Sequence, residues 1–260
     1  MKTQEVLSRL RAVAPEHYAC DWDNVGLLVD SSKKEIRRIY LSLDATDEVI
    51  AEARRLHADL LVTHHPLIFT GLKRVVEEDF IGRRIKSLIA SDMAYYAMHT
   101  SFDVAVMADI AADRLGLKQQ QVLEVLFTEG TKELGIGKVG TLEGCVTLDD
   151  CVSLVKERFG IPAVKVFGDL DTKINLVAIS PGSGKSEILF ALEKEASVLI
   201  TGDIDHHDGI DAVARGLCII DAGHYGLEHI FVPYMEHYLK ENCDGVDIIK
   251  REKIFPFQIL

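Results

Sequence analysis

Two adjacent histidines, His64 and His65, directly follow the apolar run Leu60–Thr63. Farther along the chain, His224 and Glu228 stand four residues apart, just after a second apolar run. Neutral imidazole and carboxylate groups suit divalent transition metals as ligands. These residues therefore predict a metal centre built at the ends of two strands.

A third strand end also carries ligand-type residues, because His99 and Asp103 follow the apolar run Met93–Met98. The spacing of His224 and Glu228 puts both on one face of a helix, but such a pair is usually only a surface hydrogen bond. Two histidines at a strand end likewise fit an exposed cap as well as a metal site. Three strand ends that all carry ligand-type residues favour metal binding over these alternatives.

A rival cluster comprises Asp203, Asp205, His206 and His207, which follow the apolar run Val198–Thr201. Aspartate is among the preferred residues for capping a helix, so Asp205 can equally mark the start of a helix at His206. We expect a rim or capping role for this cluster, and metal ligation is the less favoured alternative.

The segment Gly182–Ser186 (GSGKS) is similar to part of a phosphate-binding P-loop. The complete motif needs a glycine five positions before Gly184, and Ile179 stands there instead. The segment lies between a predicted strand and a predicted helix, where backbone N–H groups can hold an anion. We therefore expect a turn or a phosphate-binding lip, and no nucleoside-triphosphatase role for Lys185.

The chain contains an internal repeat of a strand–helix–strand unit. The first unit comprises strand Ile39–Leu43, helix Asp47–Leu56 and strand Leu60–Thr63; the second comprises strand Leu176–Ser180, a helix near Lys185–Glu195 and strand Val198–Thr201. The two units align without a gap, so that Ser42 meets Ser180 and Thr63 meets Thr201. Any two such units share period and length, but the common register at the strand ends favours duplication.

Alternating strands and helices predict an α/β fold, with a largely parallel sheet in each of two α/β halves. The predicted first half, residues 1–125, carries His64, His65 and Asp103, and the second, residues 126–260, carries His224 and Glu228. Since no linker separates these duplicated domains, we expect interlocked halves. Ligands of open α/β sheets bind at the carboxyl ends of the strands, which is where these five residues are expected.

Composition limits the partners and the compartment. With 29 Lys and Arg against 41 Asp and Glu, the net charge of −12 argues against nucleic acid as a general partner. Five cysteines without a Cys-x-x-Cys pair fit a reducing cytosol. The first ten residues lack an apolar signal core, and no apolar run approaches the ~20 residues of a membrane span. We expect a cytoplasmic protein with no membrane partner.

Several motifs in combination resemble the Nif-three-like family, whose members are often catalogued as GTP cyclohydrolase 1 type 2 homologues. The motifs are Leu60–Phe69 (LLVTHHPLIF), His99–Asp103 (HTSFD), Pro181–Ser183 (PGS), Gly223–Glu228 (GHYGLE), Trp22–Leu27 (WDNVGL) and Gly135–Gly144 (GIGKVGTLEG). The resemblance runs nearly from end to end. It does not include the extra domain that longer members carry.

The resemblance implies a two-metal site in a cleft between the halves. The family's ligands fall on His64, His65, Asp103, His224 and Glu228, with Glu228 as the bridge between the ions. It also implies a ring-shaped homohexamer, built as three dimers with the metal sites facing an internal cavity.

The ligand set itself points to hydrolysis, because paired divalent ions can activate water and polarise the atom under attack. Zinc, manganese, iron or cobalt would suit these nitrogen and oxygen donors. We expect a metal-dependent hydrolase that acts on a nucleotide or related heterocycle, either as a cyclohydrolase or as a phosphoesterase. His99, outside the ligand set, would shuttle the proton. The alternative is a metal-binding, ring-shaped scaffold or regulatory protein without turnover.

Overall fold

The computed structural model describes residues 1–259, apart from the side chain of Cys145. The chain forms two compact units. Unit 1 consists of Met1–Ala105 and Phe231–Lys253, and unit 2 consists of Val106–Ile230 and the tail from Ile254. Each unit contains one β-sheet with helices packed against it, so the chain has a mixed α/β fold with two sheets.

The sheet of unit 1 has five strands in the order β1-β4-β3-β2-β11. The strands are β1 (Gly26–Val29), β2 (Arg38–Ser42), β3 (Leu60–Thr63), β4 (Ala94–Ala97) and β11 (Asp247–Lys250). All neighbours pair in parallel except β1, which runs antiparallel to β4 at the edge. Every residue of β3 and β4 is buried, as expected of parallel strands covered on both faces.

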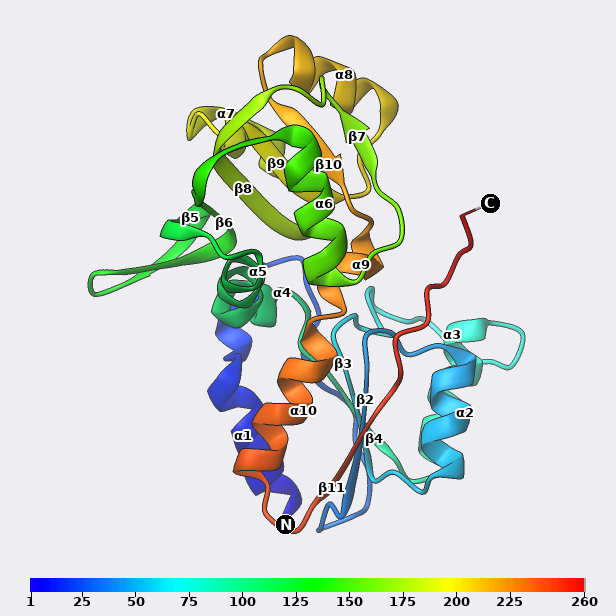
Figure 1. The fold of residues 1–260 in the computed structure, drawn as a ribbon. Coiled ribbons are helices and arrows are strands. Elements are labelled where there is room, and N and C mark those ends of the chain that lie inside the picture. Colours follow the sequence, from blue (N-terminus) through cyan, green and yellow to red (C-terminus); the bar gives the residue numbers. More distant parts are fainter. Residues whose placement is uncertain (260) are drawn as a thin grey trace. The chain divides into compact units, whose positions relative to one another are not determined.

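Helices cover both faces of this sheet (Figure 1). The helices of unit 1 are α1 (Thr3–Val13), the 3₁₀ turn Glu16–Tyr18, α2 (Asp47–Arg55), α3 (Phe80–Ala90), α4 (His99–Phe102) and α10 (Phe231–Asn242). One face packs α2 and α3 against Tyr40, Leu61 and Tyr95 of the strands. The other face carries α1 and α10. Two side-chain caps begin the helices of the first face, since Thr46 accepts a hydrogen bond from Val49 and Asp79 accepts one from Ile81.

The sheet of unit 2 has six strands in the order β5-β6-β8-β9-β10-β7. The strands are β5 (Lys118–Glu129), β6 (Lys132–Thr147), β7 (Lys165–Phe167), β8 (Lys173–Ser183), β9 (Val198–Gly202) and β10 (Cys218–Asp221). The helices are α5 (Ala108–Leu115), α6 (Leu148–Phe159), α7 (Glu187–Glu193), α8 (His206–Ala214) and α9 (His224–Glu228), with a π-helical turn at Asp103–Met107 before α5. Helices α7 and α8 pack on one face, and α6 packs on the other.

The strand registers of the two sheets agree with the sequence repeat. Ile39 of β2 faces Leu60 of β3, and Val177 of β8 faces Val198 of β9, which is the same pair shifted by 138 residues. The next strand also repeats: Leu60 faces Ala94, 34 residues later, and Val198 faces Cys218, only 20 residues later. The second unit therefore keeps the three-strand parallel core and shortens the connection to its last strand.

The structure divides the chain differently from the sequence-based halves 1–125 and 126–260. Residues 231–253 return to unit 1, because β11 pairs with β2 along four residues. Residues 106–125 belong to unit 2, since β5 forms a long antiparallel hairpin with β6. This hairpin was not expected from the sequence, and its glycines explain why. Gly135 lies so close to the carbonyl of Glu124 that no side chain would fit, so glycine here permits close strand pairing.

None of the helices in residues 1–259 has the length and apolar character that a transmembrane span requires.

Two leucines of unit 2 provide a test of this packing. Leu199 of β9 is fully buried between α7 and α8, whereas Leu189 of α7 is 54% exposed. We expect Leu199→Ala to lower the free energy of unfolding by about 2–5 kcal/mol, because it leaves a cavity in the core. Leu189→Ala should change it by less than about 0.5 kcal/mol. Urea unfolding followed by circular dichroism measures both, and equal losses would contradict the assigned core.

Candidate metal centre

His64 and His65 lie at the carboxyl end of β3, where the strand stops at Thr63. The strand therefore ends before the two histidines, and their rings lie 4.9 Å apart between centroids. The backbone of His65 is fixed by the Thr63 and Tyr95 hydroxyls, which both donate to its carbonyl oxygen, at 2.7 and 2.9 Å. The end of the strand thus allows neighbouring side chains to serve one site.

Asp103 joins these histidines within unit 1. It follows the short helix α4 and begins a π-helical turn, a rare conformation that is frequent at functional sites. Its Oδ1 lies 3.5 Å from Nε2 of His64, whose side chain is fully buried. A buried imidazole beside a carboxylate is a suitable pair of donors for a divalent cation.

Asp44 orients His65, a role that the sequence analysis missed. Its Oδ1 lies 2.8 Å from Nδ1 of His65. A carboxylate on Nδ1 is the usual outer partner of a metal-ligating histidine, since it fixes the ring and directs Nε2 to the ion. Asp44 could have been found from the sequence, because it follows β2, the strand next to β3 in the parallel sheet.

In unit 2, His224 and Glu228 both belong to the short helix α9. The predicted spacing on one helix face is confirmed, since His224 Nε2 lies 2.9 Å from Glu228 Oε2. The Glu228 side chain is buried and faces Gly182, where an added Cβ would lie only 2.6 Å from Glu228 Oε1. Gly182 therefore leaves room for this carboxylate.

Asp203 orients His224 in the same way that Asp44 orients His65. Its Oδ2 lies 2.8 Å from His224 Nδ1, and its backbone has a positive φ of 58°, unusual for a residue with a side chain. Asp205 is the N-cap residue of α8, as predicted, although its side chain accepts no capping hydrogen bond. His206 and His207, the first two residues of α8, are exposed.

His99 is oriented by Asp23, a second carboxylate that the sequence analysis did not single out. Oδ1 of Asp23 lies 2.8 Å from His99 Nδ1, and Oδ2 accepts a hydrogen bond from the backbone N–H of Thr100 at 3.0 Å. Burial alone would raise the pKa of the Asp23 carboxyl, but hydrogen bonds from His99 and Thr100 outweigh it and lower the pKa to about 2. The His99 ring lies 5.5 Å from that of His64 and 5.6 Å from that of His65.

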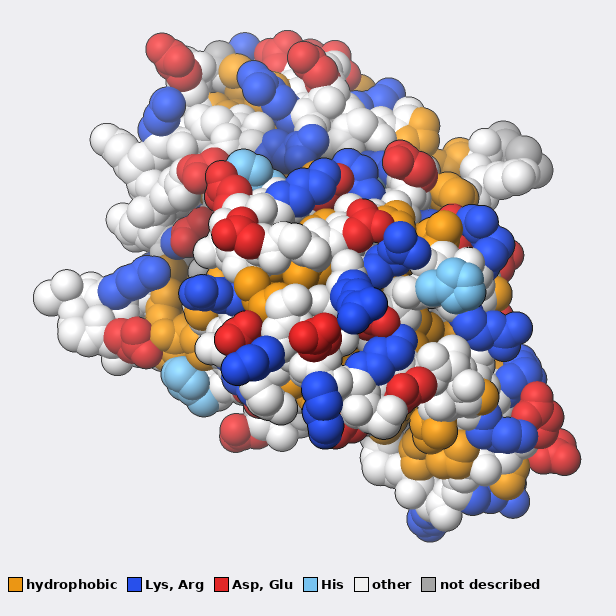
Figure 2. Space-filling model, turned by 90° about the horizontal axis from the view of Figure 1, so that it is seen from below, with side chains coloured by type: hydrophobic (Ala, Val, Ile, Leu, Met, Phe, Trp, Pro, Cys, Tyr) orange, Lys and Arg blue, Asp and Glu red, His pale blue; other side chains and the backbone are white. Residues whose placement is uncertain are grey.

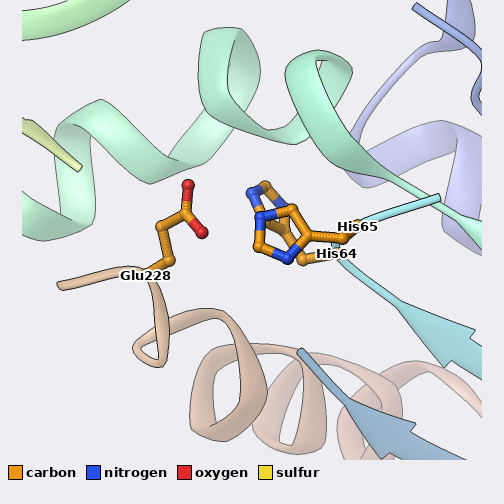
Figure 3. Close-up of side chains that lie close together, drawn as sticks. All are labelled: His64, His65 and Glu228. Carbon is orange, nitrogen blue, oxygen red and sulfur yellow. The ribbon is translucent and has the colours of Figure 1, made fainter. Parts of the chain in front are cut away.

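His64, His65 and Glu228 form a group that could hold a metal ion, since each can offer one ligand atom (Figure 3). The structure therefore contains a candidate metal site.

A family model described as Duf34/NIF3 (NGG1p interacting factor 3) matches residues 1–254. The chain belongs to the Duf34/NIF3 family. A protein of Clostridium perfringens named GTP cyclohydrolase 1 type 2 homolog is 33% identical over 264 residues, covering 100% of both chains. A relative of the same name from Lactococcus lactis is 32% identical, with 99% of both chains covered.

Two solved structures are similar to this chain over nearly its whole length. A Bacillus cereus protein related to NIF3 has a TM-score of 0.93 and 25% identity, covering 100% of this chain and 99% of that one. HcgD from Methanocaldococcus jannaschii has a TM-score of 0.82 and 28% identity, with 96% and 97% covered. The family resemblance drawn from the sequence motifs is confirmed.

In this Duf34/NIF3 protein, the Gly182–Ser186 segment differs from a P-loop. Strand β8 continues to Ser183, which pairs with Gly202 of β9, and the Gly184 N–H donates to the Gly202 carbonyl at 3.2 Å. These backbone groups are engaged in the sheet and do not form an open anion cradle. The Lys185 ammonium lies 2.8 Å from the Asp208 carboxylate, a hydrogen bond that raises the pKa of Lys185.

We expect Lys185→Ala to leave the metal content unchanged, because the ammonium pairs with carboxylates of α8 and its cap. Elemental analysis of the purified variant measures this. A Mg-dependent triphosphatase activity that is abolished by Lys185→Ala, yet survives loss of His64 and His65, would contradict this interpretation.

The carboxylates on Nδ1 give a second prediction. Asp44→Asn and Asp203→Asn keep the size of the side chain but remove the charge that orients His65 and His224. We expect each to weaken zinc affinity by about 10–100-fold. Glu241→Gln is the matched control, because Glu241 lies 3.4 Å from His237 Nε2 and both side chains are exposed. Competition with a chromogenic chelator measures affinity, and wild-type values for both aspartate variants would contradict the assigned role.

Proposed function

We propose that this chain is a dinuclear metal-dependent hydrolase that acts on a nucleotide or related heterocycle. Five side chains would hold the metal: His64, His65, Asp103, His224 and Glu228. The observation that carries the proposal is the pair of carboxylate–histidine arrangements, Asp44 with His65 and Asp203 with His224. In each, the carboxylate on Nδ1 would fix the imidazole ring so that Nε2 can serve as the metal ligand, as in known metal sites.

The donor set fits two divalent transition-metal ions. Three imidazoles and two carboxylates are more ligands than a single four-coordinate ion takes. Nitrogen and oxygen donors in this mixture suit zinc, manganese, iron or cobalt. When bound, such ions supply Lewis acidity and lower the pKa of water.

Glu228 and His99 would have separate roles at the metal centre. Glu228, buried and given room by Gly182, is assigned to the position between the two ions. His99 is assigned to proton transfer, because Asp23 holds its Nδ1 and so leaves Nε2 to exchange the proton. The low pKa of Asp23 keeps this carboxylate charged at neutral pH, where it orients the His99 ring.

This assignment separates the expected effects of two substitutions. Glu228→Ala should remove most of the bound metal, because two cations would face each other without a shared negative charge. His99→Ala should keep about two ions per chain and lose hydrolysis of the substrate. Elemental analysis of protein purified without chelator measures the metal. His237→Ala, which removes the exposed histidine of another His–Glu pair four residues apart, is the control for metal content.

Two outcomes would contradict the proposal. The first is a stoichiometry well below one ion per chain that added metal does not restore. The second is an empty site in His99→Ala with a full site in Glu228→Ala. A screen of the metal-loaded protein against nucleotides and phosphoesters tests turnover. Full metal loading without turnover of any substrate would instead favour the scaffold or regulatory function.

The family resemblance adds the proposal that six copies of the chain assemble into a ring, as a trimer of dimers. Light scattering should then give a particle of about six times the 28.9 kDa of one chain. The same measurement on each variant shows whether lost activity reflects the site or the assembly.

A further inference from the structure

Two large aromatic side chains remain exposed beside the histidines of unit 1. Trp22 is 60% exposed and Phe69 is 49% exposed, although aromatic rings of this size usually bury most of their surface. Their ring centroids lie 5.8 Å apart. Both rings also contact the ring of His99, at 5.8 Å for Trp22 and 6.1 Å for Phe69. The exposed aromatic surface is therefore continuous with the residue assigned to proton transfer.

Hydrogen bonds fix the residues next to both aromatic side chains. Trp22 directly precedes Asp23, whose carboxylate binds His99 and Thr100. Phe69 directly follows Ile68, whose carbonyl oxygen accepts a hydrogen bond from the side-chain amide of Asn24 at 2.5 Å. The two segments are thus tied to each other and to the histidines. Because the segments that carry the two rings are already held together, less ordering is needed when a ligand binds.

The ring geometry favours a flat partner. Trp22 and Phe69 are tilted by 41° and so do not stack on each other, and His99 meets both nearly edge-on, at 73° and 67°. A planar ring can add to such an arrangement through its π-face, which every nucleobase has. The polar groups at the inner edge, His99 and the buried carboxylate of Asp23, favour a ring that also carries hydrogen-bonding atoms over an aliphatic chain.

We propose that Trp22 and Phe69 form the binding site for the planar heteroaromatic ring of the substrate and hold this ring against His99. This inference rests on the proposed function and deepens it, because it names a purine-like base as the part of the substrate that is recognised. Trp22 and Phe69 act as binding residues, and His99 remains the group that carries the proton.

Fluorescence offers a direct test, because Trp22 is the only tryptophan of the chain. Guanosine and adenosine should quench its emission saturably in the full-length protein, both as purified and after chelation of metal. Ribose 5-phosphate, which has no base, should leave the emission unchanged. Free N-acetyltryptophanamide at the same absorbance corrects for light absorbed by the bases.

Phe69→Ala should weaken nucleoside binding by about 10-fold or more, the effect of losing one stacking partner. Phe80→Ala is the matched control, because Phe80 is a similarly exposed phenylalanine of unit 1, at 52%. Phe69→Leu keeps an apolar side chain without the aromatic ring, and should also weaken binding. Circular dichroism checks that each variant is folded.

Three results would overturn the proposal. One is the absence of saturable quenching by either nucleoside. Another is equal nucleoside affinity in Phe69→Ala, Phe80→Ala and the unchanged protein. The last is a lower particle mass in Phe69→Ala together with absent quenching in the unchanged protein, which would make the aromatic pair an interface between copies of the chain. Because quenching is also measured without metal, failure of the metal centre leaves this test intact.

Discussion

The hydrogen bond between a histidine Nδ1 and a carboxylate is the interaction on which the candidate site depends. It occurs at His65 with Asp44, at His224 with Asp203 and at His99 with Asp23, each time at 2.8 Å. An imidazole held in this way has a fixed ring orientation, which also sets the direction of its Nε2. Three separate carboxylates therefore orient three histidine rings of the candidate site.

The repeated sheet core explains why each unit contains a histidine–carboxylate pair at its strand ends. Strands β2, β3 and β4 have the same pairing register as β8, β9 and β10, so the strand ends occupy equivalent places in the two sheets. The residues at these ends differ. His65 corresponds to Asp203 under the repeat, so a histidine follows the central strand in unit 1 and a carboxylate follows it in unit 2. The residue that completes each pair follows a neighbouring strand. Asp44 pairs with His65 in unit 1, and His224 pairs with Asp203 in unit 2.

Local sequence patterns predicted the repeated strands and most helices. They also pointed to His64, His65 and Glu228, the group that could hold a metal ion. Strand β3 was predicted with the bounds that the structure has, because four consecutive apolar or β-branched residues end at a histidine pair. The division into units could not be read in this way, since the pairing of β11 with β2 joins residues about two hundred positions apart. Asp23 was missed for the same reason, since nothing beside it in the sequence shows that it will face His99. Asp44 follows the strand next to β3, so its place at this edge of the sheet could be expected, but its pairing with His65 could not.

The long hairpin of β5 and β6 shows a second limit to predicting structure from the sequence. Glycine usually signals a turn or an irregular segment, yet Gly135 lies within a strand where the backbone of β5 comes too close for any side chain. Gly182 has a related role, because its missing side chain leaves space for the buried carboxylate of Glu228. At Gly135 the constraint is the backbone carbonyl of Glu124, and at Gly182 it is the Glu228 carboxylate together with a positive φ of 89°. The Bacillus cereus structure, at 25% identity and a TM-score of 0.93, shows that the fold survives extensive change. Substitutions are therefore tolerated over much of the chain, but at these two glycines the distance to a neighbouring atom decides the residue.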